Sequence, residues 1–223
     1  MKSYILATNK VWNIKAFMSW RSKLDGDWEI CVSPHDLVFA SKSIKPRFVF
    51  FPHWSHIVPR DFLEVHECVC FHMTDVPYGR GGSPLQNLIV RGHKETVLTA
   101  LRMTSELDAG PVYLKRPLRL AGTAHDIFQR AADLGMEMIQ EIVQKEPEPV
   151  PQLGEPVLFK RRKPEQSKLP TDGDLYTLFD HIRMLDAPTY PLAFVEHGDF
   201  MLDFSQAILK DDEITARVSI RKK

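Results

Sequence analysis

The chain has 223 residues, of which 43% are hydrophobic, so it is long enough for one full-sized domain and a modest appendage. Its 29 basic and 29 acidic residues cancel, which excludes the excess positive charge that drives nucleic-acid binding through phosphate neutralisation. No stretch approaches the roughly 20 apolar residues of a membrane span, and the first residues do not resemble a secretion signal. We therefore expect a cytoplasmic protein with no nucleic-acid and no membrane partner.

The three cysteines, Cys31, Cys68 and Cys70, are odd in number and contain no C-x-x-C pair. Neither a disulfide framework nor a cysteine-based metal site is indicated, and in the cytoplasm reduced thiols are the expected state.

The first part of the chain has the spacing of a parallel α/β sheet. Its short apolar runs are separated by stretches long enough for crossover helices, and they cover residues 4–8, 28–33, 48–51 and 68–71. In such sheets ligands collect at the carboxyl ends of the strands. Those ends carry Asn9 and Lys10, the residues 51–54, and His72, so we expect the site to form from these loops.

The middle of the chain predicts a helix, two strands and a longer helix. Ser83 and Pro84 have the order of an N-cap and first-turn proline, and Gly92 follows the apolar stretch they open. Two strands are expected at residues 96–103 and 111–120, with a long amphipathic helix at 124–145. Together these elements predict a Rossmann-like α/β fold with a mixed, mostly parallel sheet flanked by helices.

Residues 146–170 are rich in proline and charge, which predicts a connector across the surface. A helical period and three alternating runs follow, which indicates a small α+β module made of a helix and a β-meander. The expected division is a catalytic domain over residues 1–150, a linker over 151–170 and a C-terminal module over 171–223.

The densest cluster of reactive side chains begins at Cys70 and extends to Pro84, and a Leu-Asp-Ala-Gly segment follows it. This order resembles the folate-dependent formyltransferase family, whose signature contains Asn-x-His-x-Ser-Leu-Leu-Pro, Arg-Gly-x-x-Pro, Gly-x-x-x-Thr and Leu-Asp-x-Gly. The residues in register with that signature are His72, Pro77, Arg80, Gly81, Pro84, Gly92, Thr96 and Asp108.

The resemblance implies formyl transfer from N10-formyltetrahydrofolate to an amine. That reaction needs a donor to the developing oxyanion and a base for the amine proton. His72 would stabilise the oxyanion, and Asp108 would orient His72 and accept the proton. The family's third catalytic residue, an asparagine, is replaced here by Cys70, which strand alternation places on the same face as His72. A thiol is a poorer hydrogen-bond donor than an amide.

The resemblance and the loops at the strand ends together indicate two groups of binding residues, and no metal is expected. The first, partly aromatic and apolar, would hold the folate, and consists of Trp54, His56, Ile57, Val58, Thr104, Leu107 and Asp108. The second would contact the acceptor substrate, and consists of Asn9, Lys10, Asn13, His53, Arg80 and Gly81.

The acceptor is inferred from the run of residues 71–88, which looks most like the sugar N-formyltransferases, in the branch of pseudaminic-acid biosynthesis. We therefore expect a small nucleotide-linked amino-dideoxy sugar, of the UDP-4-amino-4,6-dideoxy type. The tail is short for an enzyme that holds methionyl-tRNA. A homodimer is compatible with a chain of this size.

Two alternatives from other classes remain. A cysteine hydrolase would use Cys70 as nucleophile, His72 as base and Asp108 as orienting residue, and it requires a thiol of lowered pKa. A catalytically inactive module would bind folate or a nucleotide sugar, and it would tolerate replacement of His72.

Overall fold

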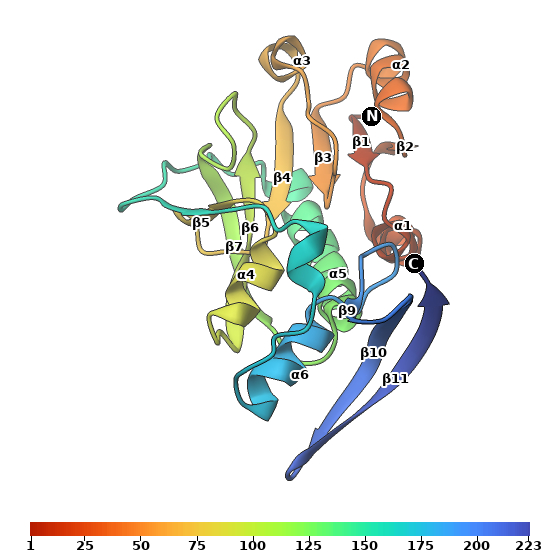
Figure 1. The fold of residues 1–223 in the computed structure, drawn as a ribbon. Helices are drawn as coiled ribbons and strands as arrows, with labels where there is room; N and C mark the ends of the chain where they lie inside the picture. Colours follow the sequence, from red (N-terminus) through yellow and green to blue (C-terminus); the bar gives the residue numbers. More distant parts are fainter. The chain divides into compact units, whose positions relative to one another are not determined.

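The computed structural model describes residues 1–223 and contains a six-stranded sheet with the strand order β2-β1-β3-β4-β6-β7 (Figure 1). The first four strands pair in parallel, and β6 runs antiparallel to β4. These pairings confirm the expectation of a mixed, mostly parallel sheet. The strands are β1 (Ser3–Ala7), β2 (Asp27–Cys31), β3 (Phe48–Pro52), β4 (Cys68–His72), β6 (Glu95–Arg102) and β7 (Val112–Arg119).

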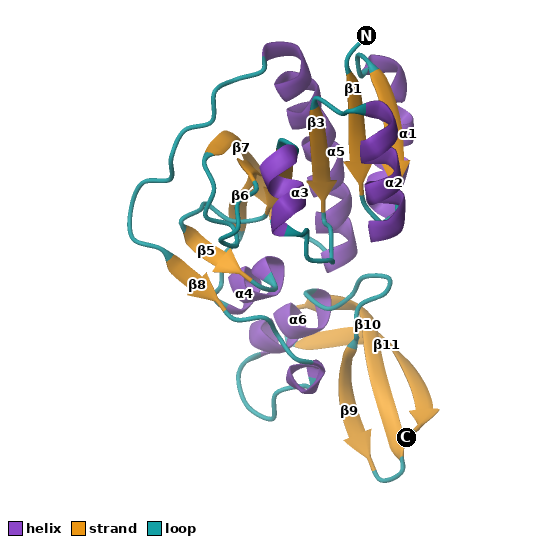
Figure 2. Ribbon diagram, turned by 90° about the horizontal axis from the view of Figure 1, so that it is seen from above, coloured by secondary structure: helices purple, strands orange, loops and turns teal.

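The centre of this sheet is buried because its strands are continuously apolar. All five residues of β3, with the sequence Phe-Val-Phe-Phe-Pro, are buried, which is typical of a parallel strand covered on both faces. Helices connect the first four strands (Figure 2), and no helix is both long and apolar enough to cross a membrane. The helices are α1 (Val11–Trp20), α2 (Pro34–Ile44), α3 (Arg60–Val65), α4 (Pro84–Val90) and α5 (Ala124–Lys145), with a short 3-10 helix at Arg21–Lys23.

The end of the chain forms the expected helix and β-meander. Helix α6 (Leu175–Arg183) packs on the long strand β10 (Phe200–Lys210). Strands β9 (Ala193–His197) and β11 (Glu213–Lys222) pair antiparallel with β10 from its two sides.

The proline-rich connector holds more regular structure than its composition indicates. Its strand β8 (Val157–Phe159) pairs with β5 (Tyr78–Gly81) in a two-stranded sheet, and a 3-10 helix follows at Pro164–Ser167. Strands of three and four residues are too short to show a period, and β5 lies in a glycine-rich stretch. The sequence therefore predicts neither of them.

The chain divides into two compact units that do not follow the expected boundaries. The first contains residues 1–81, 97–118 and 129–158, and the second contains residues 82–96, 119–128 and 159–223. Within the second unit the buried Arg183 donates to the carbonyls of Leu120 and Gly122, and Gln86 donates to that of Met184. The C-terminal module is thus joined to segments from the middle of the chain.

Candidate active site

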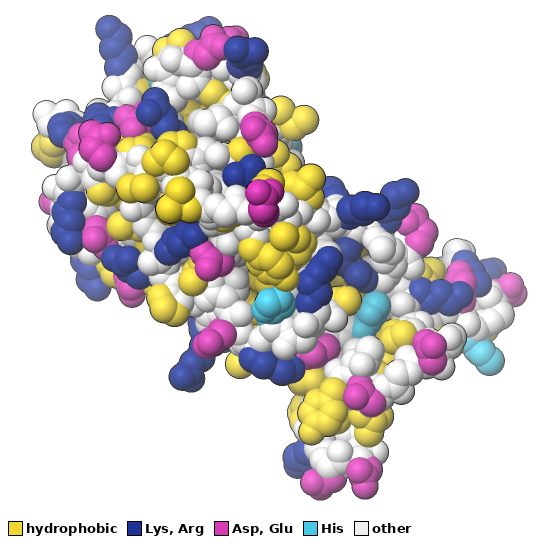
Figure 3. All heavy atoms as spheres, turned by 90° about the vertical axis from the view of Figure 1, so that its left-hand side faces the viewer, with side chains coloured by type: hydrophobic (Ala, Val, Ile, Leu, Met, Phe, Trp, Pro, Cys, Tyr) yellow, Lys and Arg dark blue, Asp and Glu magenta, His cyan; other side chains and the backbone are white.

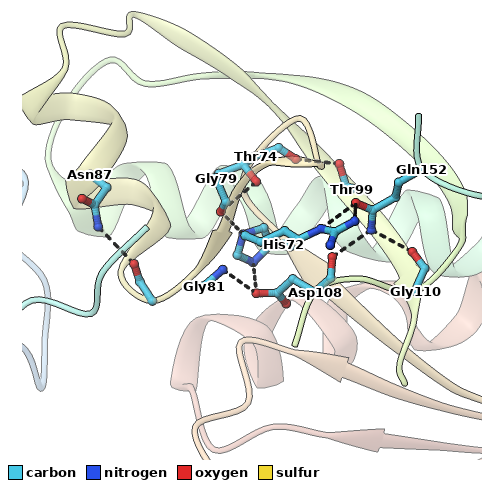
Figure 4. A network of polar contacts seen from close by, with 11 residues as sticks. His72, Thr74, Gly79, Gly81, Asn87, Thr99, Asp108, Gly110 and Gln152 are labelled. Carbon is cyan, nitrogen blue, oxygen red and sulfur yellow. Dashed lines mark hydrogen bonds and ion pairs between the residues drawn. The ribbon is translucent and has the colours of Figure 1, made fainter. Parts of the chain in front are cut away.

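His72 is the last residue of β4, and one backbone carbonyl determines which nitrogen of its ring carries a proton. Its Nε2 lies 2.8 Å from the carbonyl oxygen of Gly79, and the side chain is only 8% exposed (Figure 4). A carbonyl can only accept a hydrogen bond, so Nε2 must carry the proton and donate. In the neutral ring, Nδ1 is then a bare acceptor. The oxyanion role expected of His72 stays a prediction, and the N–H at Nε2 is engaged by Gly79.

Asp108 faces that bare nitrogen. Its Oδ2 lies 3.6 Å from Nδ1 of His72, which is longer than a hydrogen bond, and accepts the backbone N–H of Gly81 at 3.0 Å. The backbone of Asp108 is left-handed, with φ of 53°, which few residues other than glycine adopt. When the ring of His72 is neutral, two acceptors face each other in a nearly buried site.

The loop that carries Asp108 is closed tightly at its far end by Gly110. A Cβ atom at Gly110 would lie 1.8 Å from the carbonyl oxygen of Arg102, so only glycine fits there. The adjacent backbone N–H of Arg102 donates to the carbonyl of Pro111 at 2.9 Å. This close approach of β6 and the start of β7 sets the position of Asp108.

Gln152 is a site residue that the sequence does not reveal. Its Nε2 donates to the carbonyls of Asp108 and Gly110, both at 2.8 Å (Figure 4). Its Oε1 accepts from Nε and Nη2 of Arg80, at 3.0 and 2.9 Å. Gln152 lies in the proline-rich connector, where no motif or period distinguishes it from its neighbours.

Arg80 was expected to contact the acceptor substrate. Its side chain is instead bound to Gln152, and its Nη1 lies 3.4 Å from Glu106. Gly81 takes part through its backbone, because its N–H holds Asp108. The structure thus brings His72, Asp108, Arg80 and Gly81 together, as the register of the signature implies.

Cys70 does not have the properties of a nucleophile. Burial raises the pKa of its thiol, and the nearby carboxylate of Asp108 raises it further. A reactive cysteine requires the opposite shift, towards the thiolate. This environment contradicts the cysteine-hydrolase alternative and leaves Cys70 as a neutral thiol in the place of the family's asparagine.

The expected acceptor residues near β1 and β3 lie where the strand order reverses, which is the usual ligand position in such sheets. Asn13 is an exception, because it is buried and its amide donates to Thr8 Oγ1 and to the carbonyl of Pro52. It ties two strand ends together and is not presented to a ligand. Asn9 is exposed. Burial lowers the pKa of Lys10, and it lowers the pKa of His53 to about 3 with a further contribution from Lys10.

The expected folate residues form a loop after β3 and part of the loop after β6. Trp54 stands edge-on to His56 and packs, like Val58, with the buried cluster under β3. Ile57 is 94% exposed and Leu107 is 70% exposed, and the hydroxyl of Thr104 donates to the carbonyl of Glu106.

Comparison with known proteins identifies the family. A family model described as the C-terminal domain of methionyl-tRNA formyltransferase matches residues 164–221. The structure titled methionyl-tRNA formyltransferase from Clostridium thermocellum is 44% identical, with a TM-score of 0.96 and complete coverage of both chains. The chain belongs to the formyltransferase family.

Among curated relatives of this formyltransferase, the methionyl-tRNA formyltransferase of Thermodesulfovibrio yellowstonii is 27% identical over 67% of this chain. The match covers 50% of that relative, so the chain spans about half of its length.

The expectations of a nucleotide-sugar acceptor, of the pseudaminic-acid branch and of no nucleic-acid partner are wrong. The relatives with the stronger matches are named for methionyl-tRNA. A sugar N-formyltransferase from a Shewanella species is 15% identical, with a TM-score of 0.67 over 97% of this chain and 96% of its own, and shares the fold alone. The expectation of a sugar acceptor rested on the run of residues 71–88, which overlaps the signature of the whole family and therefore does not identify the acceptor. Net charge limits long-range attraction of the whole chain and does not exclude local contacts with RNA.

Proposed function

We propose that this formyltransferase moves the formyl group of N10-formyltetrahydrofolate to the α-amine of methionyl-tRNA. The observation that carries the transfer chemistry is the pair of facing acceptors, Nδ1 of His72 and the carboxylate of Asp108, 3.6 Å apart. A primary amine placed beside them can donate one N–H to each. This arrangement suits an amine nucleophile better than a hydroxyl group, which has a single proton to donate.

The same pair can remove the proton that the amine must lose after it attacks the formyl carbon, and can return it to N10 of the folate as the bond between N10 and the formyl carbon breaks and tetrahydrofolate leaves. Asp108 accepts it directly, or Nδ1 of His72 accepts it while the carbonyl of Gly79 stabilises the resulting imidazolium through Nε2–H. Loss of a positioned general base typically slows a reaction by about 100-fold to 10,000-fold. Replacement of either side chain by alanine is therefore expected to reduce turnover by that order.

Local positive charge supports the RNA acceptor in a chain that is neutral as a whole. Basic and acidic side chains are mixed on the face in Figure 3. Residues 160–163 are nevertheless four consecutive basic residues, three of them exposed. Their backbone is fixed, because Asn87 donates to the carbonyl of Lys160 and the N–H of Arg162 donates to the hydroxyl of Ser83. A fixed basic run is suited to contact phosphates.

The test is a transfer assay with N10-formyltetrahydrofolate and four amine acceptors in parallel: methionyl-tRNA, free methionine, a UDP-linked 4-amino sugar and a dTDP-linked 4-amino sugar. We expect formyl-methionyl-tRNA as the product, and its loss in His72→Ala and Asp108→Ala. We also expect the rate with methionyl-tRNA to fall steeply with added salt.

Either of two results would overturn the proposal. Transfer of the formyl group to a sugar, with no transfer to methionyl-tRNA, would show that the proposed acceptor is wrong. Full activity of both alanine variants would show that His72 and Asp108 do not form the catalytic site.

A further inference from the structure

We infer that Gln152 is a positioning residue that holds Asp108 in its working conformation, an inference that rests on the proposed formyl transfer. Gln152 belongs to the segment between α5 and β8, outside the signature that carries the other site residues. It does not face the acceptor pair itself. Its contacts are to the backbone on which one of these acceptors is mounted.

The hydrogen bonds of Gln152 leave only one orientation for its amide. The carbonyls of Asp108 and Gly110 can only accept, so the nitrogen must face them, and the guanidinium of Arg80 can only donate, so the oxygen must face it. All four contacts lie between 2.8 and 3.0 Å. Because an arginine cation polarises the amide from its oxygen side, the two N–H donors are strengthened.

The loop gains support from these contacts because the backbone bond that closes it beside Asp108 is long. Asp108 is left-handed, and the loop's internal bond from the N–H of Ala109 to the carbonyl of Glu106 is long, at 3.5 Å. Gln152 binds the carbonyls on both sides of Ala109, so it clamps the backbone directly beside the catalytic carboxylate. A small shift there would move Oδ2 away from Nδ1 of His72.

The segment that carries Gln152 is itself anchored at both ends. Val150 exchanges two backbone hydrogen bonds with Val112, at 2.7 and 2.8 Å, and the N–H of Val157 donates to the carbonyl of Pro77 at 3.1 Å. Between these anchors, Gln152 is the one residue of positions 151–157 that is not exposed. The segment thus acts as a strap whose inward side chain is Gln152.

The experiment compares Gln152→Glu in the full chain with a matched control, Gln140→Glu. Glutamate keeps the size of glutamine but removes both N–H donors and places a negative charge against two carbonyls. Gln140 is a half-buried glutamine of α5 whose amide donates to one carbonyl, that of Lys23. We expect Gln152→Glu to lower kcat by about 10-fold to 100-fold, the scale of a small misplacement of a reacting group. The KM for N10-formyltetrahydrofolate should stay within about twofold, because Gln152 holds no substrate.

A second variant separates positioning from simple loss of stability. Gln152→Met is apolar and of similar length, so it removes the donors without adding charge. It should lower kcat in the same way while the thermal midpoints of both Gln152 variants stay well above the assay temperature. Wild-type kcat in both variants would overturn the inference. So would a fall in kcat that is matched by Gln140→Glu.

The role of Gln152 can also be tested if the proposed function itself is wrong. If the unaltered protein transfers no formyl group to any acceptor, amide hydrogen exchange at residues 106–110 decides the role of Gln152 by itself. Faster exchange in Gln152→Glu than in Gln140→Glu supports the clamp, and equal exchange overturns it.

Discussion

The proton on His72 is placed by one residue, Gly79, whose carbonyl accepts from Nε2. This single contact decides that Nδ1 faces Asp108 as an acceptor, and so decides which kind of group the pair can bind. The sequence predicts that His72 and Asp108 act together, because both fall in register with the signature. It does not predict the direction of the ring, since that depends on a carbonyl seven positions away whose orientation follows from the turn before β5.

Cys70→Asn is expected to retain at least the turnover of the unaltered protein. The neutral thiol of Cys70 contributes little hydrogen bonding, whereas asparagine supplies an amide donor on the same face as His72. Steady-state kinetics of the transfer reaction measure the effect. Loss of activity in Cys70→Asn, with rapid inactivation of the unaltered protein by iodoacetamide, would restore a nucleophilic role for the thiol.

His53 makes folding sensitive to acid, because burial holds its pKa near 3 in the folded protein against 6.5 in the unfolded chain. Below pH 6.5 the unfolded chain binds the proton that folded His53 does not, so stability falls as the pH drops from 6.5 towards 3. The contribution lost at pH 5 is on the order of 1–2 kcal/mol. His53→Asn, which tolerates the left-handed backbone at this position, should reduce that loss in urea titrations at pH 7.5 and pH 5. The exposed His35→Asn serves as control and should leave the loss unchanged.

At the scale of elements, long periodic segments are predictable and short contact-dependent ones are not. The 22 residues of α5 show a helical period, and β1, β3 and β4 lie in short apolar runs that the sequence displays. By contrast β5 and β8 exist because they pair with each other across almost eighty positions. The contribution of Gln152 depends on that same pairing, so no local pattern marks it.

Two glycines give opposite predictions for the same substitution. Gly110→Ala places a Cβ 1.8 Å from the carbonyl oxygen of Arg102, and should destabilise folding by more than about 2 kcal/mol and abolish transfer through Asp108. Gly135→Ala places its Cβ within α5 at ordinary contact distance, 3.9 Å from Phe71, and should stabilise by about 0.5–1 kcal/mol. Chemical unfolding measures both. Equal stability of the two variants would contradict the close approach at Gly110.

At the scale of the whole molecule, contiguous domains were expected and interleaved units are observed. Composition marks the proline-rich connector but cannot show that earlier segments of the chain pack with the C-terminal module. The expectation of no nucleic-acid partner was wrong at this scale as well, because it rested on net charge, which is a sum over the chain and does not report local basic runs such as residues 160–163.

Replacement of Arg183 tests how the C-terminal module is held to the segment of residues 119–128. It is 4% exposed, pairs with Asp180, and donates to the carbonyls of Leu120 and Gly122. Arg183→Met leaves these buried acceptors without their donor and should destabilise the protein by about 2–4 kcal/mol. Lys168→Met removes an exposed pair with Glu196 and should change stability little. If the two variants unfold at the same urea concentration, Arg183 does not hold the C-terminal module to these loops.

The strap around Gln152 also decides where the protein can be engineered. Surface connectors usually accept inserted residues, and a proline-rich stretch would be an obvious place for a fusion or a tag. Between Val150 and Val157, however, both ends are fixed by backbone hydrogen bonds, so even one added residue must rotate or displace Gln152. Both residues of the turn at Asp211 and Asp212, between β10 and β11, are exposed and hold no site residue, so this turn is the better point of attachment.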